Sequence, residues 1–483
     1  MSPEEDRMRP LDILAGEELE RIHQATLDVL EHTGFLIQHA ATRDRLDGIG
    51  CTVRGDRVLM SADLVARALE SAPSEFTLHG RKSENDCPLV QGRSYALSTS
   101  GSPFVIDVRT GERRSALVGD VADFARLVDA LPHSHMVSPP TPKDVEPEIV
   151  SPVRVATMLR NTTKPMRVIV ESGVEVRYIL QVAAVAHGGL EAFRARPQLQ
   201  ISVSPLSPLT LSEEATQAIV ETAEAGVPLG VVPAPMVGAT GPMSLAGCLV
   251  QQNAEVLGGI VIAQTVNPGT PVVYESRLTI MDMRSGQSIW GNPEVALTNA
   301  AAAQLARYYG VPGSVTAFGT SAKGMDDQNG FERAFNLLAA VMAGASILGA
   351  MGAGDNVLHT SVELIVLDDE LVAWVDKLMR GMRVDDESLA VTAIHEAVMG
   401  DGSFLALRHT RDFLRGGEIW TPALSDRLNY EVWDQEGRPT IQQRARAKAL
   451  ELLANHEVEP LPEDVDREID AVIDDARAEL VVV

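Results

Sequence analysis

Two glutamates in the middle of the chain each follow directly on an apolar, strand-like segment. Glu171 and Glu275 hold these positions, where a carboxylate could attract a cation or polarise a water molecule. Their alternative role is structural, as partners of an arginine or as caps of the next helix. Arg277 and Arg284 lie close in sequence to Glu275. Both glutamates are therefore candidates for catalysis on the grounds of position and residue type.

Three aromatic residues lie where they could meet an organic cation. Tyr274 and Phe318 end strand-like segments, and Phe104 belongs to an earlier region that could overhang the same site. The face of an aromatic ring attracts a quaternary ammonium group through the cation–π interaction. All three are candidates for substrate binding, and for Phe318 the alternative is ordinary core packing.

A histidine stands in a loop that follows a buried, strand-like segment. The loop reads Asn356-Val357-Leu358-His359-Thr360-Ser361. A lone histidine is often a hydrogen-bonded structural residue, but this position makes His359 the foremost single candidate for catalysis. No cluster of His, Cys and Asp at metal-ligand spacing accompanies it, so no directly bound metal is predicted.

Alternating strand-like and helix-like segments between residues 133 and 399 would position these side chains. Short apolar strands without polar alternation are typical of a parallel sheet covered on both faces. Seven such segments are predicted, at residues 135–138, 166–171, 199–203, 228–232, 271–274, 314–318 and 346–351. Near eight β-then-α units, the pattern predicts an α/β fold of the (β/α)8 TIM-barrel type, with the eighth strand expected beyond Gly354. The loops after the strands then form the functional rim.

Three regions are expected along the chain. Residues 1–132 form an α+β extension, residues 133–400 the barrel, and residues 401–483 a mostly helical region. The last region carries amphipathic helices over 441–455 and 464–480, which need an apolar surface to cover, either the barrel or a partner subunit. A homo-oligomer is therefore one expectation.

The composition narrows the classes of partner. Acidic residues outnumber basic ones by 67 to 41, giving a net charge of −26, which disfavours nucleic acid and anionic lipid surfaces. Three dispersed cysteines, an N-terminus without a signal-peptide pattern and the lack of an apolar run of about 18 residues predict a cytoplasmic protein without a membrane span. No GxGxxG follows the first strand and no GxxxxGK[ST] occurs, so dinucleotide and P-loop sites lose their usual support.

Eight blocks occur in order over nearly the whole length: VIDVRTGERR, NTTKPM, SPLSPL, GATGPMSLAGCLVQQNAEVLGG, NPGTPVVY, GNPEVALTNAAAAQLARYYGVP, KGMDDQNGFE and HTRDFLRGGEIWTPALSDRLNYEVWDQEG. Together they resemble the trimethylamine methyltransferase family of corrinoid-dependent methyltransferases. The resemblance implies a TIM barrel with an N-terminal extension. It also implies methyl transfer from an amine to the Co(I) of a cobalamin-type corrinoid on a separate corrinoid protein. Members that act on trimethylamine carry pyrrolysine, whereas this chain has ordinary residues throughout. A quaternary amine such as glycine betaine, carnitine or proline betaine is therefore the expected substrate.

For a betaine substrate, rim position and residue type suggest roles for individual residues. The ammonium end would lie near Tyr274, Phe104 or Phe318, with Glu171 or Glu275 supplying negative potential, and a substrate carboxylate would meet His359, Asn356 or Arg277. The loops expected to face the corrinoid contain Gly319, Thr320, Gly352 and Gly354.

Two other readings stay open. One is a family member that has lost methyl transfer and only binds a betaine or a corrinoid protein. The other is a barrel lyase or aldolase, which would need a Schiff-base lysine or a metal cluster at a strand end. Lys164 and Lys323 are both predicted in loops, so this reading is the weaker of the two.

Overall fold

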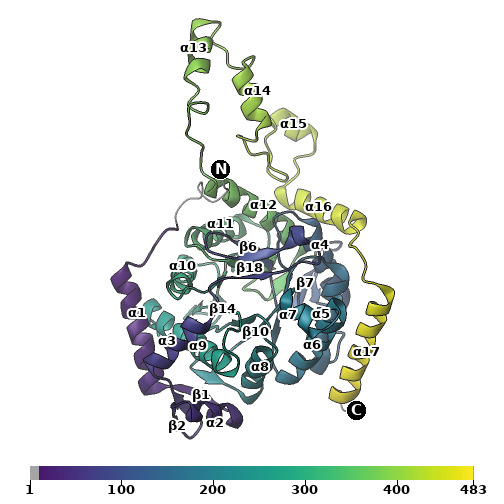
Figure 1. Cartoon of the computed structure of the whole chain (residues 1–483). Helices are drawn as coiled ribbons and strands as arrows, with labels where there is room; N and C mark the ends of the chain where they lie inside the picture. Colours follow the sequence, from purple (N-terminus) through teal and green to yellow (C-terminus); the bar gives the residue numbers. More distant parts are fainter. Residues whose placement is uncertain (1–9, 482–483) are drawn as a thin grey trace.

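A closed ring of parallel strands lies at the centre of the computed structural model, which describes residues 10–481 (Figure 1). Seven strands form one sheet in the order β6 (Tyr95–Ser98), β18 (Ile347–Met351), β17 (Gly313–Thr316), β14 (Val272–Glu275), β12 (Leu229–Val231), β10 (Leu199–Val203) and β9 (Met166–Val170). Residues 136 and 137 join the two edges, because Met136 bridges to Leu97 in β6 and Val137 bridges to Met166 in β9. The predicted TIM-barrel fold class is confirmed.

All seven predicted barrel segments take part in the ring, but the eighth strand does not lie beyond Gly354. It is β6, within residues 1–132, so the barrel begins inside the region expected to be an extension. A β-hairpin and a helix separate β6 from residue 136, so no simple β-then-α repeat reveals it. The residues after Gly354 instead form β20 (His359–Thr360), which pairs with β19 (Ala353–Gly354) and β7 (Phe104–Ile106).

Helices surround the barrel and bury its outer face. They are α4 (Val118–Ala130), α5 (Val150–Asn161), α6 (Gly173–His187), α8 (Glu213–Glu224), α9 (Leu245–Val266), α10 (Pro293–Tyr308), α11 (Asp327–Met342) and α12 (Val362–Met379). Among the described helices, α9 alone is long and apolar enough to cross a membrane by length and composition, and 72% of its most apolar window is buried. It is accordingly a core helix, packed against α8, α3 (Ala62–Ser71) and α1 (Gly16–Asp28).

Short strands surround the C-terminal ends of the barrel strands, which we call the mouth. A hairpin turn at residues 109–112 joins β7 to β8 (Arg113–Ser115), and Gly111 supplies the left-handed residue with a φ of 79°. Residues 282–287 form the turn of a hairpin between β15 (Thr279–Met281) and β16 (Ser288–Ile289). These hairpins bring residues from distant parts of the sequence to one end of the barrel.

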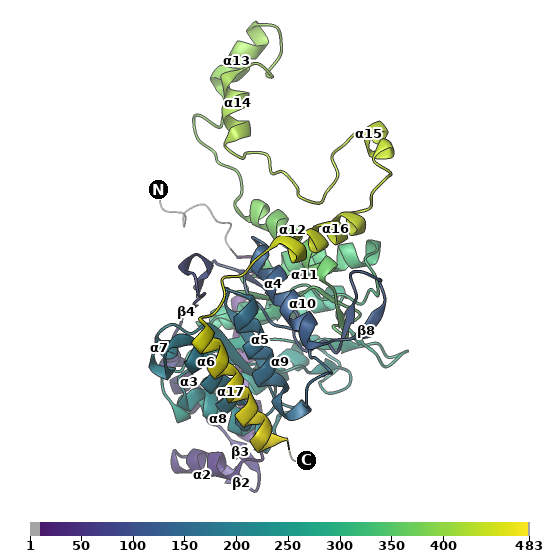
Figure 2. The same ribbon diagram turned by 90° about the vertical axis from the view of Figure 1, so that its right-hand side faces the viewer.

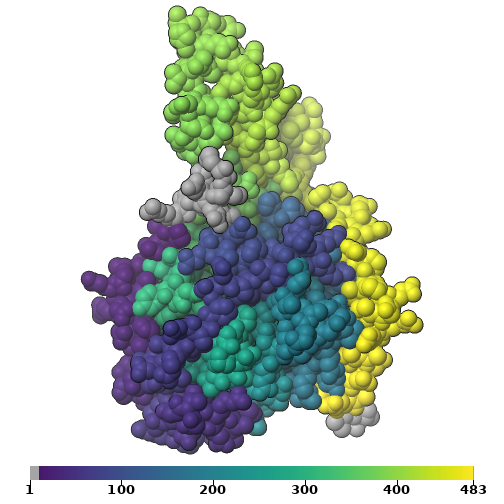
Figure 3. Space-filling model, viewed as in Figure 1, coloured from purple at the N-terminus to yellow at the C-terminus, as the bar shows by residue number. Residues whose placement is uncertain are grey.

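The C-terminal region divides into two parts. Helices α16 (Ile441–Asn455) and α17 (Glu463–Leu480) pack on the barrel helices, α16 against α12 and α4 and α17 against α5 and α6 (Figure 2). Between α12 and α16, residues 381–439 leave the body of the molecule, and we call this segment the arm. It carries α13 (Val391–Met399), α14 (Arg408–Arg415) and α15 (Tyr430–Gln435), and it stands clear of the barrel (Figures 1 and 3).

Candidate active site at the barrel mouth

A cavity of about 180 Å³ lies at the C-terminal ends of the barrel strands. Seven of the eight barrel segments reach its wall directly or through the residues that follow them, so it belongs to the barrel interior. The lining residues are Leu97, Ser98, Thr99, Ser100, Arg167, Ile169, Ser204, Val232, Ala234, Arg277, Trp290, Thr316, Ala350 and Val357.

A buried charge network forms one part of this site. The Glu275 carboxylate has no exposed surface and accepts hydrogen bonds from Arg167 Nη2 at 2.7 Å and Arg277 Nη2 at 3.1 Å, both on Oε2. Ser202 Oγ at 2.6 Å and Gln200 Nε2 at 2.7 Å donate to Oε1. The carboxylate is thus fully engaged within the protein, as a buried charge requires.

Gly230 in β12 makes room for this network. A Cβ at Gly230 would overlap Glu275 Oε1 and would lie 2.5 Å from both Gln200 Nε2 and Ser202 Oγ. The backbone of β12 can therefore approach the carboxylate only because this residue has no side chain.

The network leaves an excess of positive charge beside the cavity. Two guanidinium groups, those of Arg167 and Arg277, face a single carboxylate, and both arginines line the cavity wall. Burial lowers the pKa of Arg277 to about 10, so the side chain stays protonated at neutral pH. The local electrostatics therefore favour a small anionic group in the cavity.

Two hydroxyl groups on the cavity wall lack a protein partner. The Oγ1 atoms of Thr99 and Thr316 are buried and form no hydrogen bond with the described residues. Buried polar groups are normally paired, so these two can accept or donate hydrogen bonds to a ligand. The half-buried indole of Trp290 supplies an aromatic surface on the same wall, and its Nε1 lies 3.3 Å from Ser288 Oγ.

The backbone at the cavity edge is strained. Asp355, Asn356 and Val357 have φ angles of 49°, 57° and 66°, and Ala350 in the irregular part of β18 has a φ of 74°. A β-branched residue such as Val357 is a marked outlier in this left-handed region. Strain of this kind persists only where surrounding contacts enforce it, and it gathers at functional sites.

Hydrogen bonds from three directions hold this strained turn. Asn356 N–H donates to Thr320 O at 2.9 Å, Asp355 N–H donates to Ala322 O at 2.8 Å, and Ser102 Oγ donates to Val357 O at 2.8 Å. Thr320 is fixed in turn, because its Oγ1 donates to Glu332 Oε2 at 2.6 Å.

An ion pair with no exposed surface anchors the start of the same loop. Asp368 Oδ2 accepts from Arg333 Nη1 at 2.6 Å and from Gly352 N–H at 2.7 Å. Gly352 has a φ of 82°, a conformation that L side chains rarely adopt.

Glu171 lies apart from Glu275, so the structure does not bring the two candidate glutamates together. Glu171 is exposed and lines an outer groove of about 760 Å³ that borders the cavity through Ile169 and Ser204. This groove also contains Glu148, Glu175 and Glu214, which make it acidic.

The histidine candidate and Phe104 meet each other beside the mouth rather than on the cavity wall. His359 pairs with Phe104 between β20 and β7 and is 3% exposed. Burial lowers the pKa of His359 to about 4, so the ring is neutral at pH 7. The Phe104 ring is covered by the Arg113 guanidinium, 3.7 Å from the ring centroid. Gly354 lies against the His359 ring, and a Cβ there would overlap it.

Tyr274 and Phe318 are core residues and do not line the cavity. Successive side chains along a strand point to opposite faces, so Tyr274 points outward because Glu275 points into the barrel. Its hydroxyl bonds to Asn253 Oδ1 at 3.1 Å and its ring stacks on Tyr309. Phe318 is fully buried, in keeping with the core-packing alternative. Gly319 serves close packing, since a Cβ there would overlap the carbonyl oxygen of Trp290.

Sequence reasoning missed Arg167 and Trp290. An available signal was the charged residue inside the apolar segment Met-Arg-Val-Ile-Val, since a lone arginine within a buried strand needs an acidic partner. No comparable signal marked Trp290, which reaches the site through the tertiary arrangement of its loop.

Neither lysine fits Schiff-base chemistry at the mouth. Lys164 Nζ donates to the carbonyl oxygens of Val128, Leu131 and Ser134 at 2.6–2.7 Å, before β9 begins, at the opposite end of the barrel. Lys323 is exposed and pairs with Asp355 at 3.2 Å. Among residues 10–481, no group of three or more His, Cys, Asp and Glu side chains could hold a metal ion.

Comparisons with known proteins match this architecture. The sequence matches the family described as Trimethylamine methyltransferase (MTTB) over residues 2–481. It is 34% identical to the glycine betaine methyltransferase of Desulfitobacterium hafniense strain Y51 over 463 residues, covering 95% of both chains. It is 33% identical to the trimethylamine methyltransferase MttB of Desulfitobacterium hafniense strain DSM 10664 / DCB-2, covering 96% of this chain and 95% of the relative.

A solved structure shows the same fold at low sequence identity. The monomethylamine methyltransferase MtmB of Methanosarcina barkeri superposes with a TM-score of 0.52 at 11% identity, covering 92% of this chain and 93% of that one. The whole-length family match and two relatives above 30% identity lead to one conclusion: the chain belongs to the trimethylamine methyltransferase (MTTB) family.

Proposed function

We propose that the chain is a methyltransferase that takes a methyl group from a quaternary ammonium carboxylate, glycine betaine or a related betaine, and passes it to the Co(I) corrinoid of a separate protein. The observation that carries this proposal is the excess positive charge of Arg167 and Arg277 over Glu275 at the cavity. A betaine carboxylate matches that charge, whereas an amine without a carboxylate leaves it unmatched. The similarity to a glycine betaine methyltransferase supports the same substrate class.

The cavity offers a partner for each end of such a substrate. The guanidinium of Arg277 would bind the carboxylate, with the hydroxyls of Thr99 and Thr316 as further hydrogen-bonding groups. The ring of Trp290 would receive the ammonium group, since tryptophan is the strongest cation–π partner among the aromatic side chains. Among the candidate rings, Trp290 replaces Tyr274, Phe104 and Phe318 in this role.

The same charge excess assists the reaction. When the N–CH₃ bond breaks, the electron pair stays on nitrogen and a neutral tertiary amine leaves without needing a proton. The substrate nitrogen thereby loses its positive charge, so a site with net positive charge interacts more favourably with the transition state than with the bound cation. Glu275 does not supply negative potential to the ammonium in this scheme, because the two arginines neutralise it.

A corrinoid on a separate protein would supply the nucleophilic cobalt that accepts the methyl group. Pockets for drug-sized ligands usually measure about 300–1,000 Å³, so a cavity of about 180 Å³ suits only a small substrate. The corrinoid would therefore face the mouth from outside, next to the loops of Gly319, Thr320, Gly352 and Gly354. We also propose a cytoplasmic location, since Cys51, Cys87 and Cys248 are buried unpaired thiols.

Calorimetric binding separates the substrate classes. Glycine betaine should bind, and choline and trimethylamine, which lack the carboxylate, should bind at least tenfold more weakly. Equal binding of choline and glycine betaine would contradict the assigned role of the two arginines. Replacing Trp290 by leucine should weaken betaine binding by about 0.5–2 kcal/mol, roughly 2- to 30-fold. Trp433→Leu, in α15 of the arm, is the matched control and should leave binding unchanged.

Methyl transfer is tested with cobalamin reduced to Co(I) and with a purified corrinoid protein, followed by the spectral change of the cobalt. Transfer from glycine betaine supports the proposal. Tight binding of betaine without transfer to either acceptor would instead identify the chain as a binding member that has lost catalysis.

A further inference from the structure

Over residues 329–336, helix α11 has its polar and apolar faces reversed, whereas Leu337 and Ala340 farther along the helix are buried. Its buried side includes Glu332, Arg333 and Asn336, while Phe331 and Phe335 are 55% and 68% exposed. A helix on the surface of a soluble domain normally buries its apolar stripe and exposes its charges. The reversal indicates that the outward face of α11 is covered in the functional molecule.

The outward face of α11 forms one continuous apolar stripe. Phe331, Phe335 and the partly buried Leu338 follow one another at positions i, i+4 and i+7, and they share one side of the helix. Between residues 330 and 342, no exposed or half-buried side chain carries a charge. On neighbouring α10, Leu297 is 49% exposed. Contiguous exposed patches of this kind mark interaction sites.

A second stripe lies on α13 in the arm. Val391, Ile394 and Val398, at positions i, i+3 and i+7, are 70%, 49% and 68% exposed, while α13 buries only small side chains. Half of the large apolar side chains that are exposed among the described residues lie in the arm. A segment of this size cannot bury them within itself.

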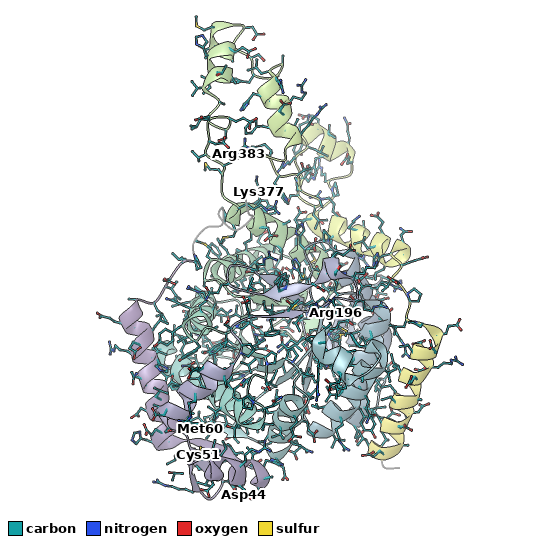
Figure 4. The ribbon with its side chains drawn as sticks, in the orientation of Figure 1. Asp44, Cys51, Met60, Arg196, Lys377 and Arg383 are labelled. Carbon is teal, nitrogen blue, oxygen red and sulfur yellow. The ribbon has the colours of Figure 1, made fainter. Side chains whose placement is uncertain are left out.

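The arm's attachment keeps α13 away from the α11 stripe of its own chain. Its return segment is fixed on α12, where the Glu370 carboxylate accepts the backbone N–H groups of Ala423, Leu424 and Ser425 at 2.8–3.0 Å. Lys377 in α12 and Arg383 in the arm mark its base (Figure 4), whereas α13 lies at its far end (Figure 1).

The position of α13 also argues that the corrinoid protein expected at the mouth is not the partner that covers α13. Helix α12 runs from the mouth toward the other end of the barrel. Arg380, which follows α12, lines a pocket together with Gly92 and Ser94, and these two residues lie just before the N-terminal end of the barrel strand β6. The chain therefore enters the arm at the end of the barrel opposite to the mouth. A protein that faces the cavity would therefore not contact α13.

We propose that the α13 stripe of one copy of this chain packs on the α11 stripe of a second copy, and that the second copy does the same in return. Each chain carries both halves of the contact and cannot bring them together alone. Reciprocal contacts of this kind close around a two-fold axis. Apolar side chains spaced at i, i+3 or i+4 and i+7 on both helices suit helix-on-helix packing. This inference does not depend on the proposed methyl transfer.

The first test is the mass of the full chain in solution, measured by light scattering at micromolar concentration. A mass of at least twice 51.9 kDa is expected. Phe335→Glu and Ile394→Glu should each raise the dissociation constant at least tenfold while leaving the circular dichroism spectrum intact. Ile49→Glu is the matched control, because Ile49 is 44% exposed between Asp44 and Cys51, at the opposite end of the molecule from the arm (Figure 4). A monomeric wild-type chain would overturn the proposal.

Disulfide trapping identifies the surfaces directly. The three native cysteines are buried, so single cysteines at Phe335 and Ile394 are the reactive thiols. Mixing Phe335→Cys with Ile394→Cys under mild oxidation should give a disulfide-linked dimer, in higher yield than either variant alone. An oligomer that forms without this cross-link would refute the assigned surfaces. A monomer that instead binds a corrinoid protein through Phe335 would refute self-association and give the stripe to that partner.

Discussion

Replacing Glu275 by glutamine tests whether one carboxylate balances two buried arginines at the mouth. The substitution keeps the size of the side chain and removes the charge that holds Arg167 Nη2 at 2.7 Å and Arg277 Nη2 at 3.1 Å. Glu275 is fully buried and Arg167 is 2% exposed, so water reaches the guanidinium groups only through the cavity and replaces the lost carboxylate poorly. Breaking a buried ion pair on one side costs about 3–5 kcal/mol, and that is the expected loss of unfolding free energy.

The same change makes the cavity more attractive to an anion. Thermal unfolding of Glu275→Gln, with and without glycine betaine, should show a lower midpoint in the absence of ligand and a larger upward shift with betaine than in the wild type. Binding of a ligand to the folded state at 100 times its dissociation constant adds about 2.7 kcal/mol, enough to recover much of the loss. Choline should not produce this recovery, since it lacks the carboxylate.

Glu171→Gln is the matched control. Its carboxylate is exposed in the outer groove, so the expected change in unfolding free energy is within about 0.5 kcal/mol. If Glu275→Gln is as stable as this control, the carboxylate does not carry the assigned balance of charge. If choline stabilises the variant as well as betaine does, the cavity does not recognise an anion.

Two further substitutions test the support of the site. Burial lowers the pKa of His359 from 6.5 to about 4, so the unfolded chain takes up the proton first as the pH falls, and stability present above pH 6.5 is lost on the way to pH 4. His359→Gln should reduce this loss by up to about 3 kcal/mol in denaturant titrations at pH 7 and pH 4.5, and exposed His32→Gln should not. Gly230→Ala should destabilise the fold by roughly 1–3 kcal/mol, because its Cβ would overlap the Glu275 network, whereas Gly119→Ala in α4 meets no neighbouring atom within 4 Å. Equal melting temperatures for the two alanine variants would contradict the close approach of β12.

Most barrel strands could be predicted from the sequence because they are buried on both faces. Segments such as 199–203 are apolar without alternation, and glycine and proline mark the ends of the helices between them. The strand β6 was not predicted as a barrel strand. It pairs with β18, about 250 residues away in the sequence, and no local pattern indicates such a distant partner. The exposure of Phe331 and Phe335 on helix α11 appears only when its neighbours are in place.

The candidate site shows the same division. Residue type and position after a strand identified Glu275 and Arg277 as candidate site residues. Both belong to the buried network beside the cavity. Which face of the barrel wall Tyr274 occupies was not decided by its position at a strand end, since a shift of one residue reverses the side-chain direction. Trp290 lines the cavity because the hairpin β15–β16 carries it there.

By itself, the sequence determined the fold class, the family resemblance and the acidic character of the chain, because these depend on local periodicity, ordered motifs and composition. The tertiary structure alone decided that two arginines share one carboxylate, that the first barrel strand comes from residues 95–98, and that α11 and α13 both present apolar stripes to the outside. The physical reason is that charge balance, strand pairing and burial are relations between residues distant in the chain. Such relations exist only in the folded chain.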